Sequence, residues 1–425
     1  MNRVVNRIVC GEIFLDATLR LSSVRNITPV KRRVLPLVLV AAVAVQFFAE
    51  AMPFGDEGAA VTESAVRLSP PVEDLVTVSD SGSLDTSTEA QALAAARQAR
   101  ADSTVVGSAS IAMQRIRRGA SPVQDAPAFM SIPMGTTVID ADVIGILMGH
   151  DVSAVLSPTS IVMSTRTASL RGAQAGDVIT LRSAFGSEVD FTIGAIVADE
   201  ITGGTELLIT PEAAQRISLN RKSRVVMWGF ESRAEVGTAL ADQGLVSTRI
   251  RIRRSWDPFD PDSTLGMARS KELLGEFGYR VASTGAVTQE AAWQSANLPS
   301  GRRLLNSAIP IRARCHLVVE PALRAALAEA AAAGVGGVFD VGDANLAGGC
   351  HNPRFSRLSQ SSTIGFLSRH SWAMAIDINT RGSCQGCAPP DFATDPGGCT
   401  AVRIFRKHGF AWGGNFLTPD GMHFE

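Results

Sequence analysis

Four residues near the carboxyl end of this chain combine imidazole and carboxylate groups at a spacing that could support hydrolysis. The stretch SRHSWAMAIDIN contains His370 and Asp377 in an otherwise apolar run, and the final stretch FAWGGNFLTPDGMHFE contains Asp420 and His423. Zinc accepts histidine and aspartate, and three protein ligands leave a fourth position for water, as in catalytic sites. Zinc lowers the pKa of that water toward about 7, and a nearby carboxylate can take its proton. We therefore predict Zn2+ held by His370, Asp377 and His423, with Asp420 as the general base.

His370 and Asp377 can share a site only if the backbone bends between them. On a helix a spacing of seven would align them, whereas on a straight strand it points them to opposite faces roughly 23 Å apart, at about 3.3 Å per residue. The alternation IDI favours a strand for the second half of the stretch. We therefore expect a bend between Ser371 and Ala375, with His370 on the incoming loop.

These two stretches resemble the zinc D-alanyl-D-alanine carboxypeptidases and L-alanyl-D-glutamate endopeptidases that cut peptidoglycan stem peptides. The shared pattern is S-x-H-x6-D, then W-G-G, then D-x-x-H-F-E, and it extends upstream through CHNPR and RCHLVVEPALRAAL to KELLGEFGYR, covering residues 264–425. The resemblance implies the same three zinc ligands and places Asp420 at the catalytic acidic position. It also implies that Arg354, in CHNPR, binds substrate and stabilises the oxyanion, with Arg357 one turn away as the alternative.

Two features depart from the family pattern. Ala373 stands where a glycine is common, which affects the expected local backbone geometry. The cysteine-rich insert RGSCQGCAPPDFATDPGGC replaces a shorter loop and could reshape the substrate cleft. The other histidines of this region, His316, His351 and His408, lack partners at ligand spacing, so we expect them to be structural.

The chain is long enough for two or three domains, and its patterning predicts an α+β fold. Residues 103–255 contain short strand-like runs such as GDVITLR and VDFTIGAIV, and TELLITPEAAQRI predicts a strand followed by a helix that opens at its proline. We expect a small α+β accessory domain here. After the turn-rich WDPFDPDS, residues 264–425 predict an α+β zinc peptidase domain with a central antiparallel sheet and helices over 320–334 and 400–409.

The middle region has two features that suggest contacts with other molecules. The order VMSTRTASLRGAQAGDVITLR, a strand pair, then ELLITPEAAQRI resembles the extracytoplasmic domain of macrolide-exporter-type ABC permeases, which implies contact with an envelope protein and no catalysis. The stretch RIRIRRSW places Arg249, Arg251 and Arg253 on one strand face and Ile250 and Ile252 on the other. We expect a solvated face, with contact to an anionic cell-wall polymer as the alternative.

The amino-terminal residues predict export. Residues 1–33 form a basic tail that precedes the apolar run VLPLVLVAAVAVQFFA, so 34–54 is expected to be a signal anchor or a cleaved signal peptide. The acidic residues 56–89, rich in Ser and Thr, predict a mobile tether, and EAQALAAARQARAD after them predicts a weak helix, within a flexible linker over 56–102. We therefore expect an extracytoplasmic protein that is anchored in the membrane, or secreted if the segment is cleaved, with Cys10 on the cytoplasmic side.

Export makes disulfides the expected state of the cysteines in the carboxyl-terminal part. We predict a Cys315–Cys350 bridge and a second bridge from Cys399 to Cys384 or Cys387, which leaves one thiol unpaired.

These features together predict a zinc-dependent peptidase of the D-Ala-D-Ala carboxypeptidase type, acting on peptidoglycan stem peptides. An L-Ala-D-Glu-type endopeptidase and a non-catalytic envelope scaffold remain the alternatives. Asp420 favours the enzyme, because a scaffold could lose the base while keeping the ligands. The 40 basic residues balance the 41 acidic ones, so charge gives no reason to expect nucleic acid as a partner.

Overall fold

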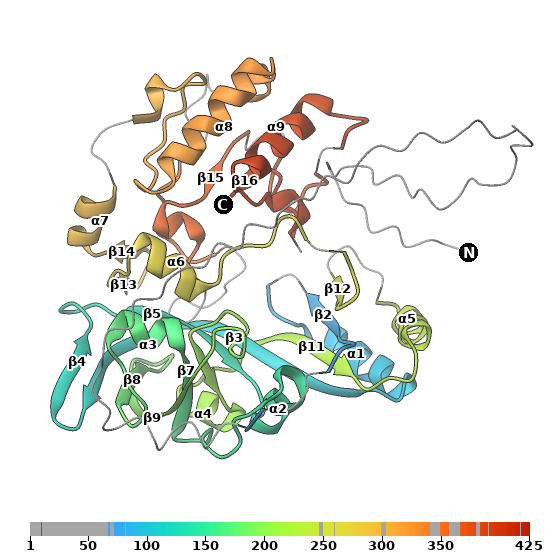
Figure 1. Cartoon of the computed structure of the whole chain (residues 1–425), viewed down its shortest axis with the longest axis vertical. Coiled ribbons are helices and arrows are strands. Elements are labelled where there is room, and N and C mark those ends of the chain that lie inside the picture. The colour runs from blue at the N-terminus through green and yellow to red at the C-terminus, as the bar shows by residue number, and fades with distance from the viewer. Residues whose placement is uncertain are drawn as a thin grey trace, which may run out of the picture.

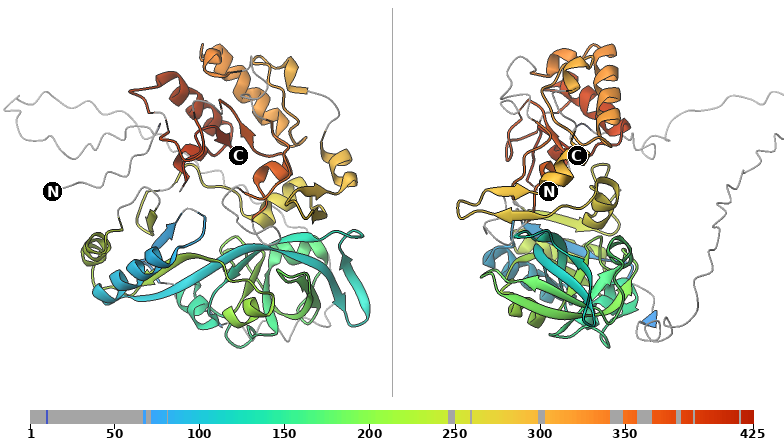
Figure 2. Two further views of the ribbon diagram at one scale, coloured as in Figure 1. Left: turned by 180° about the vertical axis from the view of Figure 1, so that it is seen from behind. Right: turned by 90° about the vertical axis from the view of Figure 1, so that its left-hand side faces the viewer.

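The structure is a computed structural model, and its elements form two stacked parts (Figure 1). It describes residues 10, 67–68, 72–80, 82–245, 250–258, 260–298, 303–340, 349–356, 366–379, 383–389, 391–416 and 418–425. The lower part is built on a large sheet, and the upper part consists of helices and short strands that end at the carboxyl terminus (Figure 2). The predicted signal segment, 34–54, lies outside the described residues. Within the described ranges, no helix is both long and apolar enough to cross a membrane.

A mixed ten-stranded sheet forms the lower part. Its strands are β2 (Val76–Asp80), β3 (Asp102–Arg118), β4 (Ser121–Asp125), β5 (Ile132–Val138), β7 (Ser160–Ser164), β8 (Val178–Arg182), β9 (Glu188–Val197), β10 (Leu207–Ile209), β11 (Lys222–Trp228) and β12 (Ile250–Arg254). Six of them, in the order β3-β5-β10-β7-β9-β8, close into a ring because β8 also pairs with β3. The pairs β5–β10 and β7–β9 are parallel, and the other pairs of the ring are antiparallel. A separate two-stranded pair joins β1 (Arg67–Leu68) to β6 (His150–Asp151).

The sheet continues beyond the ring from β3 through β11 and β2 to β12. Helices α1 (Thr86–Gln98) and α5 (Arg233–Asp242) cover one face of this extension, with small alanine side chains that allow close packing. Around the ring lie α2 (Ala141–Met148), α3 (Thr165–Arg171) and α4 (Pro211–Arg216). The α4 helix begins as predicted, since Thr210 accepts a hydrogen bond from the amide of Ala213 and Pro211 occupies the first turn.

Short elements build the upper part around one apolar core. Its helices are α6 (Met267–Leu274), α7 (Ala291–Asn297), α8 (Glu320–Ala332) and α9 (Pro396–Lys407), with 3-10 turns η1 (Arg303–Asn306), η2 (Gly336–Val338), η3 (Arg369–Trp372) and η4 (Gly413–Asn415). Its strands are β13 (Tyr279–Val281), β14 (Val287–Gln289), β15 (Ile376–Asp377) and β16 (His423–Phe424). The helices α8 and α9 confirm those predicted over 320–334 and 400–409, and they pack against each other.

The predicted fold class was wrong in its arrangement of strands. Among the described residues, the upper part has no central antiparallel sheet, only the two-stranded pairs β13–β14 and β15–β16. The alternating run around Asp377 forms a strand of two residues because Ala373 and Asn379 take left-handed backbone angles, with φ of 52° and 62°, on either side of it. The accessory region is likewise a mixed, partly closed sheet rather than a small α+β domain.

Part of the predicted flexible linker is folded. Strand β2 pairs with both β11 and β12 inside the large sheet, and α1 agrees with the helix predicted over EAQALAAARQARAD. The composition of residues 56–89 did not predict β2, because the strand has only two apolar side chains. Both of them, Val76 and Val78, are fully buried. The linker prediction for 56–66 and 69–71 falls outside the described residues.

Buried charges join the two parts. Glu206, in the loop before β10, binds Lys271 of α6 at 3.0 Å and Arg171 of α3 at 3.1 Å, and all three side chains are fully buried. Glu276 lies 2.9 Å from Lys271 and completes the cluster. Removing one side chain of such a group leaves an unpaired buried charge, which lowers the free energy of unfolding by about 3–5 kcal/mol. The ring and the upper part are therefore held in a fixed relation at α6.

Candidate metal centre and cleft

His370 is held by the backbone around it. Ser368 caps η3, and His370, which is 1 % exposed, has Nδ1 2.9 Å from the carbonyl oxygen of Cys350. Cys350 is itself fixed by its disulfide to Cys315. This contact makes Nδ1 the hydrogen-bond donor, so Nε2 carries the lone pair that can bind a metal ion.

Asp377 and His423 lie directly opposite each other in the pair β15–β16. Opposite residues of an antiparallel pair project to the same face, so their side chains meet. Oδ1 of Asp377 lies 3.0 Å from Nε2 of His370 and 3.0 Å from Nδ1 of His423. The bend that brings His370 to this strand is at Ala373, within the predicted span between Ser371 and Ala375.

These three side chains fit a metal ion. One ligand atom from each lies within 4.8 Å of the others, and no other group of three or more His, Cys, Asp or Glu in the described ranges could hold a metal. Burial opposes ionisation of the Asp377 carboxyl, yet the hydrogen bonds from His370 and His423 keep its pKa below the usual range. Burial likewise opposes protonation of His423, but Asp377 and Glu425 raise its pKa to about 10. The site thus attracts positive charge, which a divalent cation would supply.

Glu425 is a site residue that sequence reasoning missed. Its carboxylate accepts a hydrogen bond from Nε2 of His423 at 2.8 Å, which leaves Nδ1 facing Asp377. A carboxylate behind a ligand histidine fixes the ring and strengthens it as a ligand. The signal was present in the final letters HFE, since residues two apart on a strand share a face.

Asp420 and Arg354 line the same cavity as His370 and His423, which has a volume of about 500 Å³. Gly413 positions Asp420, because its carbonyl accepts the Asp420 amide at 2.8 Å and a Cβ at Gly413 would lie 2.5 Å from the Asp420 carbonyl oxygen. Nη1 of Arg354 donates to the hydroxyl of Ser368 at 2.7 Å. The structure therefore places both predicted catalytic residues beside the predicted ligands, while Arg357 lies outside the described residues.

The accessory ring forms part of this cavity. Gly135 of β5 and Gly204 and Thr205 of the loop before β10 line it together with residues 264–267. Close approach requires glycine here, because a Cβ on Gly266 would lie 2.6 Å from the carbonyl oxygen of Gly204. The cleft is therefore built from both parts of the molecule.

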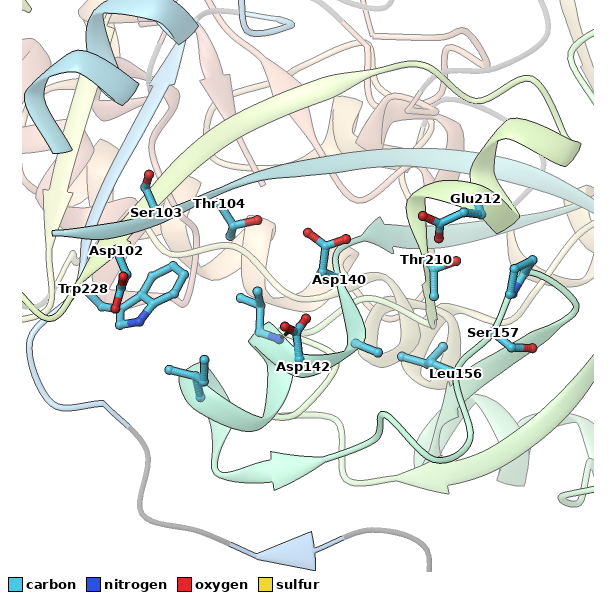
Figure 3. A pocket seen from close by; sticks show the side chains of 14 residues that line it. Asp102, Ser103, Thr104, Asp140, Asp142, Leu156, Ser157, Thr210, Glu212 and Trp228 are labelled. Carbon is cyan, nitrogen blue, oxygen red and sulfur yellow. Dashed lines mark hydrogen bonds between the residues drawn. The ribbon is translucent and has the colours of Figure 1, made fainter. Parts of the chain in front are cut away.

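A second cavity, of about 700 Å³, lies in the lower part and is acidic (Figure 3). Asp102, Asp140, Asp142 and Glu212 line it beside Trp228. Burial and the charges of Asp142 and Glu212 raise the pKa of Asp140. No three of these carboxylates lie close enough to share a metal.

The three histidines predicted to be structural, His316, His351 and His408, have structural partners. His316 lies 3.0 Å from the carbonyl of Leu274, and His408 lies 2.9 Å from Glu329. His351 contacts the side-chain amide of Gln289 at 2.7 Å.

The cysteine pairing corrects two predictions. The Cys315–Cys350 bridge is confirmed, but Cys384 pairs with Cys387 and Cys399 pairs with Cys10, so no thiol remains free. The Cys10 carbonyl also accepts a hydrogen bond from Arg406 at 3.1 Å. A disulfide joins residues of one compartment, so this pairing does not fit a cytoplasmic Cys10 with residues 264–425 outside.

A family-model match agrees with the carboxyl-terminal site. Residues 361–425 match the family model described as D-alanyl-D-alanine carboxypeptidase, and this segment contains His370, Asp377, Asp420 and His423. No curated protein matches the chain. Among solved structures, it is similar to the extracellular domain of the noncanonic ABC-type transporter YknZ from Gram-positive bacteria. That match has 13% identity and a TM-score of 0.27, and covers 42% of this chain and 99% of the other.

Proposed function

We propose that this chain is a zinc-dependent peptidase of the D-Ala-D-Ala carboxypeptidase type, acting on peptidoglycan stem peptides. One observation carries the proposal: three ligand-type side chains converge beside a cavity that Asp420 and Arg354 also line. The family match over 361–425 supports a peptidase. The disulfides fit an oxidising compartment and hence an extracytoplasmic location.

Each residue of the cleft has a defined part in the proposed reaction. When bound by His370, Asp377 and His423, zinc would supply Lewis-acid activation of a water molecule. Asp420 takes a proton from the attacking water and delivers it to the leaving amine. Arg354 binds the substrate carboxylate and balances the negative charge that develops on the scissile carbonyl.

Incubation of the purified full-length chain with zinc and defined stem peptides tests the proposal. Mass spectrometry should detect release of the terminal D-alanine. His370→Ala should abolish both stoichiometric zinc, measured by elemental analysis, and activity. His408→Ala is the matched control, because it removes a histidine outside the site, and it should retain both.

The other outcomes assign other functions. Cleavage within the peptide, between L-Ala and D-Glu, would identify the endopeptidase alternative. Stoichiometric zinc without cleavage of any peptide would favour a binding or scaffold role. Full zinc content in His370→Ala would reject the metal site itself.

A further inference from the structure

Two arginines of the accessory sheet, Arg224 and Arg251, lie on the face directed toward the upper part, and Arg221 lies beside them. In register, Arg224 of β11 is opposite Ser79 of β2, and Ser79 is opposite Arg251 of β12, so these side chains share one face. Arg221 lies immediately before β11. On the other face, the isoleucines of β12 pack against the core beneath α1 and α5, as the alternation in RIRIRRSW predicts.

Among the described residues, these arginines have no acidic partner. Within the part of the chain that the structure describes, Arg221, Arg224 and Arg251 form no ion pair, whereas Arg253 on the same face pairs with Asp260. Nε of Arg221 is buried without a hydrogen bond. Burial lowers the pKa of all three arginines, and for Arg251 the charge of Arg253 adds to this effect while Asp262 opposes it. Partly buried cations without a counter-ion are costly unless an anion binds them.

The arginine face borders the cleft at two places. The guanidinium of Arg221 lies over the ring of Phe366, 5.4 Å from its centroid, and Phe366 lines the cavity. Arg251 donates a hydrogen bond to the carbonyl of Asn415. The next residue, Phe416, lines the cavity and lies 5.8 Å from the His423 ring, centroid to centroid.

We propose that Arg221, Arg224 and Arg251 form a carboxylate-binding surface that holds an acidic peptide whose end lies in the peptidase cleft. This inference rests on the proposed function and adds that the substrate is recognised through internal acidic groups. Guanidinium groups bind carboxylates through paired hydrogen bonds. Continuity with the cavity walls favours a peptide over an anionic cell-wall polymer as the occupant.

Equilibrium binding to the zinc-loaded full-length protein tests the inference. Two synthetic peptides that end in a single D-alanine, the form left after cleavage, differ only in an internal glutamate or glutamine. Calorimetry should show that the glutamate peptide binds about 10- to 100-fold more tightly, as expected for hydrogen bonds to a charged group. Arg224→Gln should remove this preference, because Arg224 makes no other described contact through its side chain. Arg224→Lys should restore part of it.

Arg253→Gln is the matched control, since it removes an arginine of the same sheet face that already has a partner. It should keep the full preference. Equal affinity of the wild type for both peptides, or a preference that survives Arg224→Gln, would contradict the inference. The inference would also be contradicted if the two peptides bound equally and a phosphate-containing wall polymer displaced them from the wild type but not from Arg224→Gln. Hydrolysis without a glutamate preference rejects only this inference, and a preference without any hydrolysis rejects only the proposed function.

Discussion

Glu425 controls the orientation of His423. Burial alone would raise the pKa of the Glu425 carboxyl, but the hydrogen bond from His423 and the charge of Arg369 lower it, so the group is ionised. Its contact with Nε2 of His423 leaves Nδ1 directed at Asp377. Glu425 therefore supports the proposed ligand set without belonging to it.

Glu425→Gln should weaken zinc binding by about 10- to 100-fold, because the neutral amide holds the imidazole less strongly and makes it a poorer ligand. Competition with a chelator of known affinity measures the change. Glu329→Gln is the control, because it alters the same kind of carboxylate–histidine pair, with His408, away from the cleft. Equal zinc affinity in Glu425→Gln and the wild type would show that Glu425 does not support the site.

Asp420→Asn should retain zinc while turnover falls by roughly 10²- to 10⁴-fold, the usual loss for a general base. The amide keeps the shape of the side chain but accepts no proton. Metal content must be measured beside turnover on the same preparation. Loss of zinc in proportion to activity would make Asp420 a ligand, and no change in either would place the base elsewhere.

Residue types and spacing predicted the candidate ligands, because zinc chemistry limits which side chains can serve. The same reasoning missed Glu425 although it stands two residues from His423, since an acidic residue near a candidate ligand has many ordinary explanations. It also could not pair Cys10 with Cys399, because no local pattern relates residues 389 positions apart.

Among the elements, β14 joins the two segments that carry Arg354 and His370. Nε2 of Gln289 donates to the carbonyl of Ser371 at 2.6 Å, and its Oε1 lies 2.7 Å from Nε2 of His351. Gln289 is buried, so this bridge is shielded from water. Burial, with a smaller effect from the charge of Arg314, lowers the pKa of His351 to about 4.

This lowered pKa predicts loss of stability in acid. Between pH 6.5, the ordinary pKa of histidine, and about 4, the unfolded chain binds a proton at His351 that the folded chain does not. The contribution to stability is therefore complete above pH 6.5 and declines as the pH falls toward 4. Thermal midpoints of the zinc-free protein should fall over this range, and His351→Gln should reduce the slope. An unchanged slope in His351→Gln would contradict the prediction.

Helices and long strands were predictable because their periodicity is local, as β9 and α8 show. The central sheet expected in the upper part was wrong, because strand length there depends on backbone angles at Ala373 and Asn379 that an apolar alternation does not reveal. Closure of the ring could not be predicted from local sequence patterns either, since the pairing of β3 with β8 is a long-range contact.

In the whole molecule, the segment between the two parts contributes to the cleft. Asp262 is fully buried in its side chain and accepts hydrogen bonds from Arg406 at 2.8 and 2.6 Å. It also accepts the amide of Trp412 at 2.8 Å and the side chain of Asn415 at 2.6 Å. These bonds fix the segment that holds Asp420 through Gly413. A domain boundary at residue 264, as the sequence predicted, would exclude Asp262 from the peptidase part.

Asp262→Asn in the full-length chain should lower the free energy of unfolding of the upper part by about 3–5 kcal/mol, because Arg406, with a side chain 14% exposed, loses its counter-ion. Denaturant unfolding, followed by the fluorescence of the buried tryptophans, measures the change. Asp260→Asn is the control: its partner Arg253 is 45% exposed, and such pairs contribute about 0–1 kcal/mol. Turnover should fall in Asp262→Asn more than in Asp260→Asn, since the segment before Asp420 loses its anchor. Equal stability of the two variants would show that the contacts of Asp262 do not support the peptidase part.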